Sequence, residues 1–481
     1  MAAEAGAMAS LRPGTRVHFV GIGGAGMSAL ARALLARGCR VSGSDLREAA
    51  ATRRLAALGA AVEIGHRAGA PAGSDLVVVS RAIPPTNVEV EEARRLGIPV
   101  WHRAELLGRL LSGGRAVAVS GTHGKTTTTA MIAAVLAAGG LDPTAFVGAD
   151  VAGLEGNVRL GSSDVTVAEV DESDGSLLLV RPWSAVITSL EATDHMDHYG
   201  SFDAMVETFA HFLARLPREG FALVSADQAP ADRLLGVTPA RALTYGLEDD
   251  TAAPGGVVYT ARTVEVEGLR RRSVVNRGGR DVGELTLPVP GRHNLANAVA
   301  AVAVAMEMGV PFDAAARALG AFRGADRRFA MVGEAGGVVL VDDYAHNPTK
   351  VAAALRAARE TWPRRRLVAV FQPHRYTRTQ TLHAAFGPAF TDADEVIVTE
   401  IYAADEPPIP GVTARLIFDA VRAHHRAAHM APDGNLVDWL LPRLRPGDVV
   451  MTLGAGDIGV VAHAVLDRLR QRGTGAAQWG A

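Results

Sequence analysis

The stretch GTHGKT, residues 121–126, has the composition of a loop that holds phosphate. It follows an apolar stretch, AVAVS at 116–120, and opens a helical pattern. Glycines let backbone N–H groups approach an anion, and a helix N-terminus adds a favourable dipole. Lys125 would reach the outer phosphates, and the hydroxyl of Thr126 suits Mg²⁺. The pattern predicts a nucleoside phosphate site, the alternative being a strand-to-helix turn with an incidental lysine.

Lysine is scarce in this chain, because only Lys125 and Lys350 are lysines among 49 Lys and Arg residues. A lysine inside a glycine loop therefore indicates a need for a compact ammonium rather than the planar fork of arginine. The strict pattern G-x-x-x-x-G-K-[ST] is not met, since Val119 occupies the first glycine position. The shorter form G-T-H-G-K-T is what the sequence contains.

Two acidic clusters, AEVDESD and LEATDHMDH, follow apolar stretches at 165–170 and 184–190 that we expect to be strands. Oxygen ligands suit Mg²⁺, and open α/β sheets bind ligands at the carboxyl ends of their strands. Either cluster alone could be a solvated loop. The candidate metal ligands are Glu169, Asp171, Glu172, Asp174, Glu191, Asp194, His195, Asp197 and His198.

Two glycine motifs invite a different interpretation. Gly21, Gly23 and Gly26 fit G-x-G-x-x-G between a strand at 16–20 and a helical pattern, and Asp45 ends the next strand. The same spacing recurs at Gly454, Gly456 and Gly459. Taken alone, these motifs indicate an oxidoreductase with dinucleotide sites. Because UDP also carries a pyrophosphate, the first motif could serve UDP instead, and the second could be a structural turn.

Alternating apolar strands and helical patterns predict an α/β protein built on parallel sheets. A length of 481 residues suggests about three domains. The turn-rich SGG at 112–114 and the region near Arg327 are the expected boundaries.

Composition narrows the classes of partner and compartment. The formal net charge of −2 gives no indication of nucleic acid or of a membrane surface as partner. A single cysteine, Cys39, fits a reducing compartment. We see neither a signal peptide nor an apolar stretch near the roughly 20 residues that span a bilayer, so we expect a cytoplasmic protein.

Taken together, seven motifs give the chain a recognisable pattern. In order they are GIGGAGMS, GTHGKTT, AEVDESD, DHMDHYG, GRHNLAN, DDYAHNP and FQPHRYTRT. This pattern resembles the Mur ligase family over about residues 16–465. The resemblance implies three domains: a Rossmann-like UDP-binding domain at 1–113, a P-loop ATPase-like parallel sheet at 114–325, and a Rossmann-like domain for the amino acid at 326–481.

The resemblance also implies a reaction in peptidoglycan precursor synthesis. The lactyl carboxylate of UDP-N-acetylmuramate attacks the γ-phosphate of ATP and forms an acyl phosphate, which the amine of L-alanine then attacks. Transfer between two anions needs charge neutralisation by Mg²⁺, here two ions, and by preplaced cations.

The same resemblance assigns roles to individual positions of this sequence. The implied ATP-binding residues are Gly121, Thr122, His123, Gly124, Lys125, Thr126, Thr127, His293, Asn297 and Arg327. The implied UDP-substrate residues are Gly23, Gly24, Ala25, Gly26, Asp45, Ser80, Asn87 and Arg103. The implied metal ligands are Thr126, Glu169 and His195. The implied catalytic residues are Lys125, His195, His346, Arg375 and Arg378, with Tyr344 near the amino-acid end.

The sequence departs from the family pattern T-N-x-E-x-D-H at two points. Ser189 replaces the Asn, and one extra residue precedes Asp194 and His195. In addition, no lysine lies between Lys125 and Lys350, so the carbamylated lysine of several sister ligases has no counterpart. This favours the alanine-adding branch.

Three alternatives stay open at this point. A related ligase joins a preformed murein peptide to the same nucleotide sugar, an oxidoreductase would use the two glycine motifs, and a switch protein would hydrolyse ATP without ligation. A monomer and a homodimer are equally compatible with the sequence.

Overall fold

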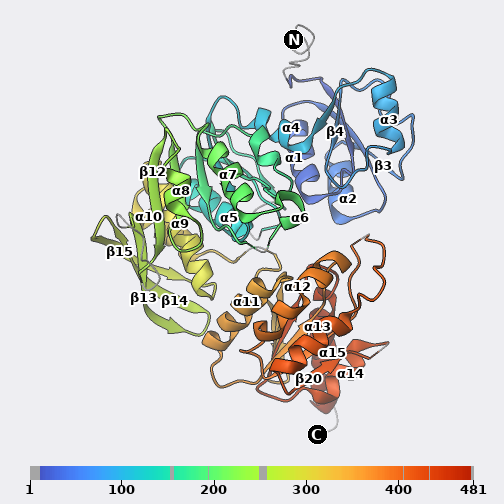
Figure 1. The fold of residues 1–481 in the computed structure, drawn as a ribbon, viewed down its shortest axis with the longest axis vertical. Coiled ribbons are helices and arrows are strands. Elements are labelled where there is room, and N and C mark those ends of the chain that lie inside the picture. Colours follow the sequence, from blue (N-terminus) through green and yellow to red (C-terminus); the bar gives the residue numbers. More distant parts are fainter. Residues whose placement is uncertain are drawn as a thin grey trace. The chain divides into compact units, whose positions relative to one another are not determined.

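A computed structural model describes residues 11–151, 156–192, 194–248, 257–324, 326–404, 406–432 and 434–477, without the side chains of 197 and 473–477. Two compact units divide the chain. The first unit comprises Met1–Arg262, Ser273–Leu285 and Ala296–Phe322. The second unit comprises Thr263–Arg272, Thr286–Leu295 and Arg323–Ala481. Figure 1 shows the elements of both units.

The amino-terminal part of the first unit is a parallel sheet of five strands in the order β3-β2-β1-β4-β5. The strands are β1 (Arg16–Val20), β2 (Arg40–Asp45), β3 (Ala61–Ile64), β4 (Leu76–Val79) and β5 (Val100–His102). The helices are α1 (Ala25–Ala36), α2 (Ala50–Ala57), α3 (Val88–Arg95) and α4 (Arg103–Leu110). The strand order reverses between β1 and β4, which is where open α/β sheets form a ligand crevice.

The central sheet contains ten strands in the order β15-β14-β13-β12-β11-β10-β6-β9-β7-β8. The strands are β6 (Arg115–Ser120), β7 (Thr144–Phe146), β8 (Val158–Arg159), β9 (Val165–Glu169), β10 (Ser184–Ile187), β11 (Phe221–Ser225), β12 (Arg241–Leu247), β13 (Tyr259–Glu267), β14 (Arg270–Arg277) and β15 (Arg280–Leu287). The helices are α5 (Lys125–Ala138), η1 (Ser176–Leu179), α6 (Met196–Tyr199), α7 (Phe202–Leu213), α8 (Ala231–Leu235), α9 (Arg292–Glu307) and α10 (Phe312–Gly320). Strand β6 pairs in parallel with both β9 and β10, so the segments that follow these three strands leave the sheet at one edge.

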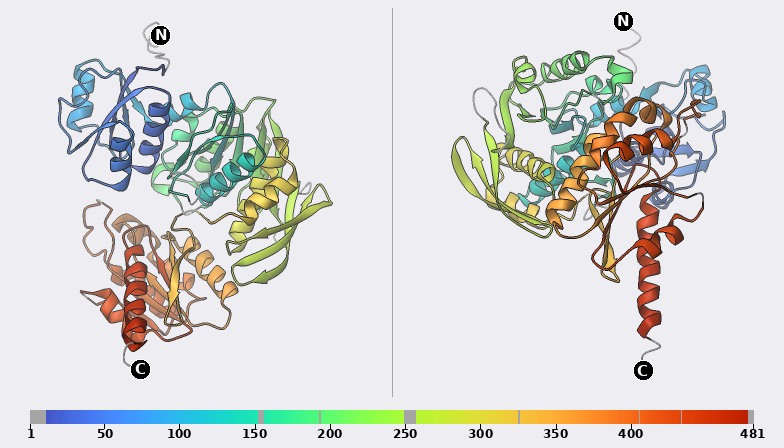
Figure 2. Two further views of the ribbon diagram at one scale, coloured as in Figure 1. Left: turned by 180° about the vertical axis from the view of Figure 1, so that it is seen from behind. Right: turned by 60° about the horizontal axis from the view of Figure 1, so that its bottom comes forward.

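The carboxyl-terminal sheet has the order β16-β17-β21-β18-β19-β20, with only the β16–β17 pair antiparallel. The strands are β16 (Ala330–Ala335), β17 (Val338–Asp343), β18 (Leu367–Phe371), β19 (Glu395–Val398), β20 (Ala428–Met430) and β21 (Val449–Leu453). The helices are α11 (Pro348–Thr361), α12 (Tyr376–Ala389), α13 (Ala414–His424), α14 (Leu436–Leu440), η2 (Leu441–Arg443) and α15 (Gly459–Ala477). Figure 2 shows α15, in dark red, as a long helix at the carboxyl end of the chain.

The predicted α/β class with parallel sheets is confirmed. The domain boundaries at 113/114 and 325/326 stay predictions. The two segments Thr263–Arg272 and Thr286–Leu295, which we expected in the central domain, group with the second unit. In the part of the chain that the structure describes, every helix is too short or too polar to cross a bilayer.

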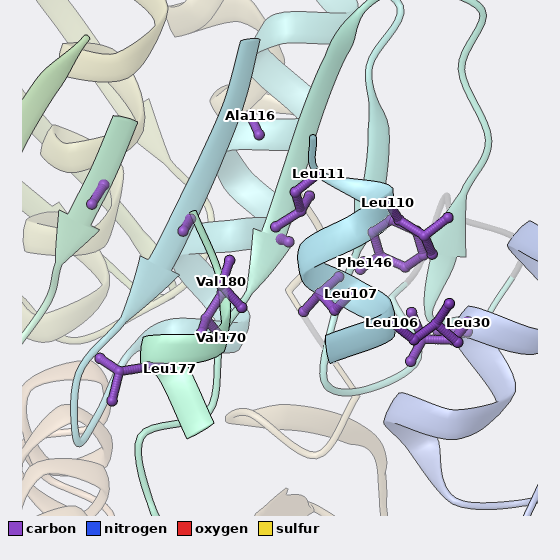
Figure 3. Packing of buried hydrophobic residues seen from close by; sticks show 14 of the residues in the cluster. Leu30, Leu106, Leu107, Leu110, Leu111, Ala116, Phe146, Val170, Leu177 and Val180 are labelled. Carbon is purple, nitrogen blue, oxygen red and sulfur yellow. The ribbon is translucent and has the colours of Figure 1, made fainter. Parts of the chain in front are cut away.

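One hydrophobic cluster joins the amino-terminal and central sheets. Helix α4 contributes Leu106, Leu107 and Leu110, which lie in one buried cluster with Leu30 of α1 and Phe146 of the central sheet. Figure 3 shows these side chains converging on α4. Such continuous burial favours keeping the two sheets together, because separating them would expose apolar area to water.

Polar contacts supplement this packing. The guanidinium of Arg54 donates to Asp150 at 2.9 Å, and that of Arg81 donates to the carbonyl of Ser173 at 3.0 Å. The side-chain amide of Asn157 donates to the carbonyl of Ala25 at 2.5 Å, at the start of α1. The amino-terminal glycine loop is therefore tied directly to the central domain.

We predict that Leu107→Ala lowers the free energy of unfolding of the first unit by about 2–5 kcal/mol, because a 6 % exposed leucine leaves a cavity. Leu58→Ala is the matched control, since Leu58 is 53 % exposed and should change stability by less than about 0.5 kcal/mol. Urea denaturation followed by circular dichroism measures both. Equal midpoints for the two variants would contradict the packing role of Leu107.

Candidate functional site

The loop between β6 and α5 has a backbone that needs glycine at two positions. Gly121 has φ +131° and Gly124 has φ +79°, both in the left-handed region. A Cβ on Gly121 would lie 2.5 Å from Oγ1 of Thr188, and one on Gly124 would lie 2.7 Å from Oδ1 of Asn297. Gly124 is the N-cap of α5 and supplies no side-chain cap, so the first-turn N–H groups can face an anion.

Side chains from the end of β10 hold this loop in place. The N–H of His123 donates to Oγ of Ser189 at 2.8 Å, and the hydroxyl of Thr188 donates to the carbonyl of His123. Ser189, which replaces the family Asn, thus supports the phosphate loop. From the other side, the hydroxyl of Thr128 donates to Oδ1 of Asn297 at 3.1 Å, which fixes Asn297 beside the start of α5.

Lys125 is half-buried among carboxylates, with 16 % of its side chain exposed. Its Nζ donates to the carbonyl of Gly121 at 2.6 Å and to Glu172 at 2.9 Å. Burial by itself lowers the pKa of Lys125, yet the charges of Glu172, Asp171 and Glu169 outweigh it and raise that pKa. The lysine therefore carries its positive charge at neutral pH.

Glu172 connects this lysine to the second acidic cluster. Its side chain is fully buried, and Oε1 lies 3.1 Å from Nε2 of His195. Burial lowers the pKa of His195, but the hydrogen bond to Glu172 and the charge of Asp194 outweigh it and raise that pKa. The hydroxyl of Tyr199 donates to the backbone carbonyl of Glu172. His195 thus lies against Glu172, and its role as a metal ligand stays a prediction.

Two groups of side chains have donor sets that suit a divalent cation. Oγ1 of Thr126 lies 3.1 Å from Oε1 of Glu169, whose Oε2 accepts from the N–H of Gly148 at 2.7 Å. These oxygen ligands fit Mg²⁺. A second group, with donor atoms within 4.8 Å of one another, is His123, Glu191 and Asp194. His123 was not among the sequence-based metal candidates, and Thr193 and the side chain of Asp197 lie outside the described residues.

A cavity of about 260 Å³ joins the phosphate loop to the amino-terminal glycine loop. Lys125 and Glu169 line one side, and Gly26 and Arg103 line the other. Nη2 of Arg103 donates to Oδ2 of Asp171 at 2.6 Å. Burial would raise the pKa of Asp171, but the charges of Lys125 and Arg103 outweigh it and lower that pKa. The cavity therefore has cations on two sides and could hold an anionic group between them.

The amino-terminal loop is arranged as the motif predicts, with Gly24 as N-cap of α1 and Ala25 as its first residue. The N–H of Gly23 donates to Oδ2 of Asp45 at 2.8 Å. Asn87 instead accepts from the N–H of Glu89 and caps α3. Ser80 follows β4 at the crevice end of the sheet. Their contacts with a UDP substrate stay predictions.

In the second unit, the motifs DDYAH and HRYTR come together around His374. Its Nδ1 lies 3.0 Å from Nη1 of Arg378, and its ring stacks on Tyr402. Because a guanidinium only donates, Nδ1 accepts, so the ring is neutral. Burial, followed by the charges of Arg378 and Arg375, lowers the pKa of His374 to about 4. The neutral ring leaves the arginines as the positive groups of this cluster.

His346 lies next to this cluster, with ring centroids of His346 and His374 5.9 Å apart. Its Nδ1 donates to the carbonyl of Tyr344 at 2.8 Å. Burial, then the charges of Lys350 and Arg378, hold the pKa of His346 well below its ordinary value. Arg375 is the N-cap of α12, with φ +72°, and keeps a half-exposed side chain. The predicted amino-acid residues of this unit are therefore neighbours.

Arg327 makes different contacts from those expected of a nucleotide ligand. Its Nε donates to Asp342 at 2.8 Å, while Nη1 and Nη2 donate to the carbonyls of Gly456 and Gly454 at 2.8 and 2.7 Å. A Cβ on Gly459 would lie 2.7 Å from Oδ2 of Asp342. The second glycine motif is thus packed by protein groups, which favours the structural-turn interpretation. The predicted contact of Arg327 with ATP stays a prediction.

The helix α9 carries the other predicted adenine contacts. His293 and Asn297 lie one turn apart on this helix and so share a face of it, where His293 is exposed and Asn297 is buried. Asn297 touches the phosphate loop through Thr128, while the role of His293 stays a prediction.

Sequence reasoning missed several supporting residues. Asn157 and Gly148 had no motif to mark them. Thr188 and Tyr199 lay within recognised patterns but had no assigned role, and Glu172 was one of several acids without an assigned partner. The AEVDESD cluster was the available signal for Glu172, but its pairing with Lys125 depends on the register of β6 and β9.

A phosphate loop on a parallel sheet, sharing a cavity with a second glycine loop, defines an α/β nucleotide-binding protein with two anion sites side by side. Three family models then cover most of the chain: "Mur ligase family, catalytic domain" at 16–115, "Mur ligase middle domain" at 119–305, and "Mur ligase, glutamate ligase domain" at 327–456. The chain belongs to the Mur ligase family, and the predicted resemblance is confirmed.

Named relatives extend this similarity over nearly the full length. The chain is 46 % identical to a UDP-N-acetylmuramate–L-alanine ligase of Sorangium cellulosum, covering 95 % of this chain and 97 % of the relative. The chain is 47 % identical to the ligase of the same name from Rubrobacter xylanophilus, covering 94 % of this chain and 100 % of the relative. A crystal structure of the Thermotoga maritima UDP-N-acetylmuramate-alanine ligase matches this chain with a TM-score of 0.79 at 29 % identity. The match covers 95 % of this chain and 99 % of the crystallised chain.

We predict that Gly124→Ala abolishes detectable Mg·ATP binding, since the added Cβ would clash with Asn297 and displace the loop. Gly140→Ala is the matched control, because Gly140 follows the same helix with φ +80° and has nothing within 4 Å of its added Cβ. The control should lose only about 1–2 kcal/mol of stability and keep its affinity. Isothermal titration calorimetry checks this, and similar dissociation constants for both variants would refute it.

Proposed function

We propose that this protein is an ATP-dependent ligase that joins L-alanine to the lactyl carboxylate of UDP-N-acetylmuramate, forming ADP and phosphate in peptidoglycan precursor synthesis. The observation that carries this proposal is the shared cavity, with Lys125 and Glu169 on one side and Gly26 and Arg103 on the other. It allows the acid end of a nucleotide sugar to meet the terminal phosphate of a nucleotide.

The proposed chemistry transfers a phosphoryl group and then replaces it. A carboxylate oxygen attacks the γ-phosphorus, the bond to the ADP oxygen breaks, and an acyl phosphate forms. The amine of L-alanine attacks the acyl carbon, loses a proton, and phosphate leaves. Lys125 and Arg103 supply positive charge where two anions must approach, and preplaced charge of this kind lowers such barriers.

Thr126 and Glu169 would hold the Mg²⁺ ion, since their oxygens are 3.1 Å apart and match its ligand preference. When bound, Mg²⁺ neutralises phosphate charge. We also propose a second ion with His195 as ligand. The group of His123, Glu191 and Asp194 is an alternative place for that ion.

We assign the remaining residues by the same logic. The backbone of 121–127 would bind the phosphates of ATP, with Asn297, His293 and Arg327 toward the nucleoside. The UDP moiety would contact the loop at 23–26 together with Asp45, Ser80, Asn87 and Arg103. In the second unit, His346, Arg375 and Arg378 would act on the amino acid, because arginine pairs bind carboxylates through bidentate contacts.

The runner-up is a ligase that joins a preformed murein peptide to the same nucleotide sugar. The relatives at 46–47 % identity carry the name of the alanine ligase. A murein peptide ligase from Psychrobacter arcticus shares the fold at 23 % identity and a TM-score of 0.68. The names of the relatives favour alanine as the acceptor. Membership in a ligase family also decides against the oxidoreductase interpretation of the glycine motifs.

We predict phosphate release from ATP only when UDP-N-acetylmuramate and L-alanine are both present. A coupled phosphate assay, with mass spectrometry of the product, measures this with one amino acid at a time and then with the tripeptide. Turnover with the tripeptide but not with L-alanine would overturn the proposal in favour of the runner-up. ATP hydrolysis without an amide product would indicate a switch protein.

We predict that Lys125→Ala lowers kcat about 10²–10³-fold, because one positioned cationic donor to a transition state is worth about that much. Lys125→Arg should recover only part of the rate, since the guanidinium is larger and planar. Steady-state kinetics at saturating substrates measures both. A kcat for Lys125→Ala within about threefold of the parent would remove Lys125 from the mechanism.

A further inference from the structure

A buried polar cluster lies in the amino-terminal sheet, and the proposed reaction does not use it. It consists of His18 on β1, Ser44 on β2, His66 after β3, and Glu89 in the first turn of α3. Glu89 and Ser44 are 0 % exposed, His18 is 2 % exposed, and the side chain of His66 is 14 % exposed. Four ionisable or hydroxyl groups buried together in this way need a complete set of hydrogen bonds.

Glu89 is the acceptor at the centre of this cluster. Its Oε2 accepts from the hydroxyl of Ser44 at 2.6 Å and lies 3.2 Å from Nε2 of His18. Its Oε1 accepts from the backbone N–H of Arg67 at 3.1 Å. Burial by itself would raise the pKa of Glu89, but these donors outweigh it and lower that pKa. Glu89 is therefore an ionised carboxylate, which accepts hydrogen bonds and donates none.

The charge on Glu89 decides where the imidazole protons lie. The hydroxyl of Ser44 donates its one hydrogen bond to Glu89. Oγ of Ser44 therefore has only lone pairs left for Nδ1 of His66, which lies 2.9 Å away. A neutral His66 must then carry its proton on Nδ1, which leaves Nε2 as an acceptor. Both ring nitrogens of His18 also have partners, since its Nε2 lies 3.2 Å from Oε2 of Glu89 and its Nδ1 lies 2.9 Å from Oγ of Ser42.

His66 lies where a nucleoside would reach the sheet. Strands β2 and β3 pair in parallel with Asp45 opposite Ile64, and the N–H of Gly65 donates to the carbonyl of Asp45 at 2.8 Å. Asp45 in turn holds Gly23 of the glycine loop. Among the described residues, the ring of His66 has partners only at Nδ1. Leu46 and Ile64, 70 % and 56 % exposed, add an uncovered apolar surface at this edge.

We propose that Glu89, acting through Ser44, is a positioning residue that presents Nε2 of His66 as a hydrogen-bond acceptor to an O–H or N–H donor of the uridine. Leu46 and Ile64 supply the apolar surface beside the base. This inference rests on the proposed function, because it names how the nucleoside end of the UDP substrate is recognised. A neutral Nε2 acceptor selects for a donor and repels a carbonyl oxygen, so it contributes specificity as well as affinity.

The variant Glu89→Gln makes a sharp test because the geometry dictates its orientation. The backbone N–H of Arg67 cannot reverse, so the amide oxygen of Gln must face it and the NH₂ group must face Ser44 and His18. Ser44 then donates to Nδ1 of His66, and the proton of His66 moves to Nε2. Ser42→Ala is the matched control, because it removes the partner of His18 and leaves the contacts of His66 intact.

Two measurements follow on the full chain. In ¹⁵N spectra of histidine-labelled protein, we expect the Nδ1–H form of His66 in the parent and in Ser42→Ala, and the Nε2–H form in Glu89→Gln. By calorimetry, we expect the Kd for UDP to rise about tenfold in Glu89→Gln and in His66→Ala. The double variant should show the same rise as each single variant, because both changes remove one interaction. The Kd for Mg·ATP should stay unchanged in all of them. Ser44→Ala breaks the same chain and keeps the Glu89 carboxylate, although it removes one of the donors to it, and it replaces Glu89→Gln if that variant does not fold.

The outcomes separate this inference from the proposed function. A folded Glu89→Gln or Ser44→Ala variant that binds UDP like the parent overturns the inference, and so does an Nε2–H tautomer in the parent. A protein that binds UDP with the expected losses but forms no amide overturns the proposed function alone. The ratio of the Kd of His66→Ala to the Kd of the parent can also be measured for 3-methyluridine diphosphate and for 2′-deoxyuridine diphosphate. If this ratio is the same for both analogues as for UDP, the acceptor role of Nε2 is excluded.

Discussion

The ion pair between Lys125 and the buried carboxylate of Glu172 is the interaction on which the site depends. The side chain of Glu172 is fully buried and that of Lys125 is 16 % exposed, and the Glu172 carboxylate alone would be a costly buried charge. Their pairing holds the ammonium at the mouth of the phosphate loop, and Glu172 also holds His195. One carboxylate therefore links the first turn of α5 to the segments that follow β9 and β10.

This arrangement gives the shared cavity its electrostatic character. Carboxylates that would otherwise repel a triphosphate are already engaged: Glu172 by Lys125, Asp171 by Arg103, and Glu169 by Thr126 and Gly148. The hydrophobic cluster around α4 keeps the glycine loop of the amino-terminal sheet close to this place. A ligase of this kind needs two anionic substrates next to each other, and in the function that we propose the first unit supplies cations and backbone N–H groups for both. In the inference that we draw, the buried Glu89 cluster adds recognition at the uridine end of the nucleotide.

Much of the fold and part of the site could be predicted because the relevant signals are local. An apolar strand precedes Gly21 and another precedes Gly121, and a helical pattern follows each glycine loop. Each of these sequences predicts a strand-to-helix turn from neighbouring residues alone. The protein contacts of Arg327 could not be predicted in this way. Its guanidinium donates to Asp342 and to two glycine carbonyls more than a hundred residues away, and its contact with ATP stays a prediction. Asn157 carries no motif, and its contact with Ala25 spans 132 residues.

The sequence by itself determined the chemistry and the order of the elements, because glycine spacing, a solitary lysine and acidic clusters after apolar strands depend on near neighbours. Only the tertiary structure decided which acid meets that lysine, which serine holds the loop, and which hydroxyl lies against Nδ1 of His66. Lys125 and Glu172 are 47 residues apart, and Ser44 and Glu89 are 45 apart. Such pairs are set by the register of parallel strands and the packing of helices on them, and these depend on the whole chain at once.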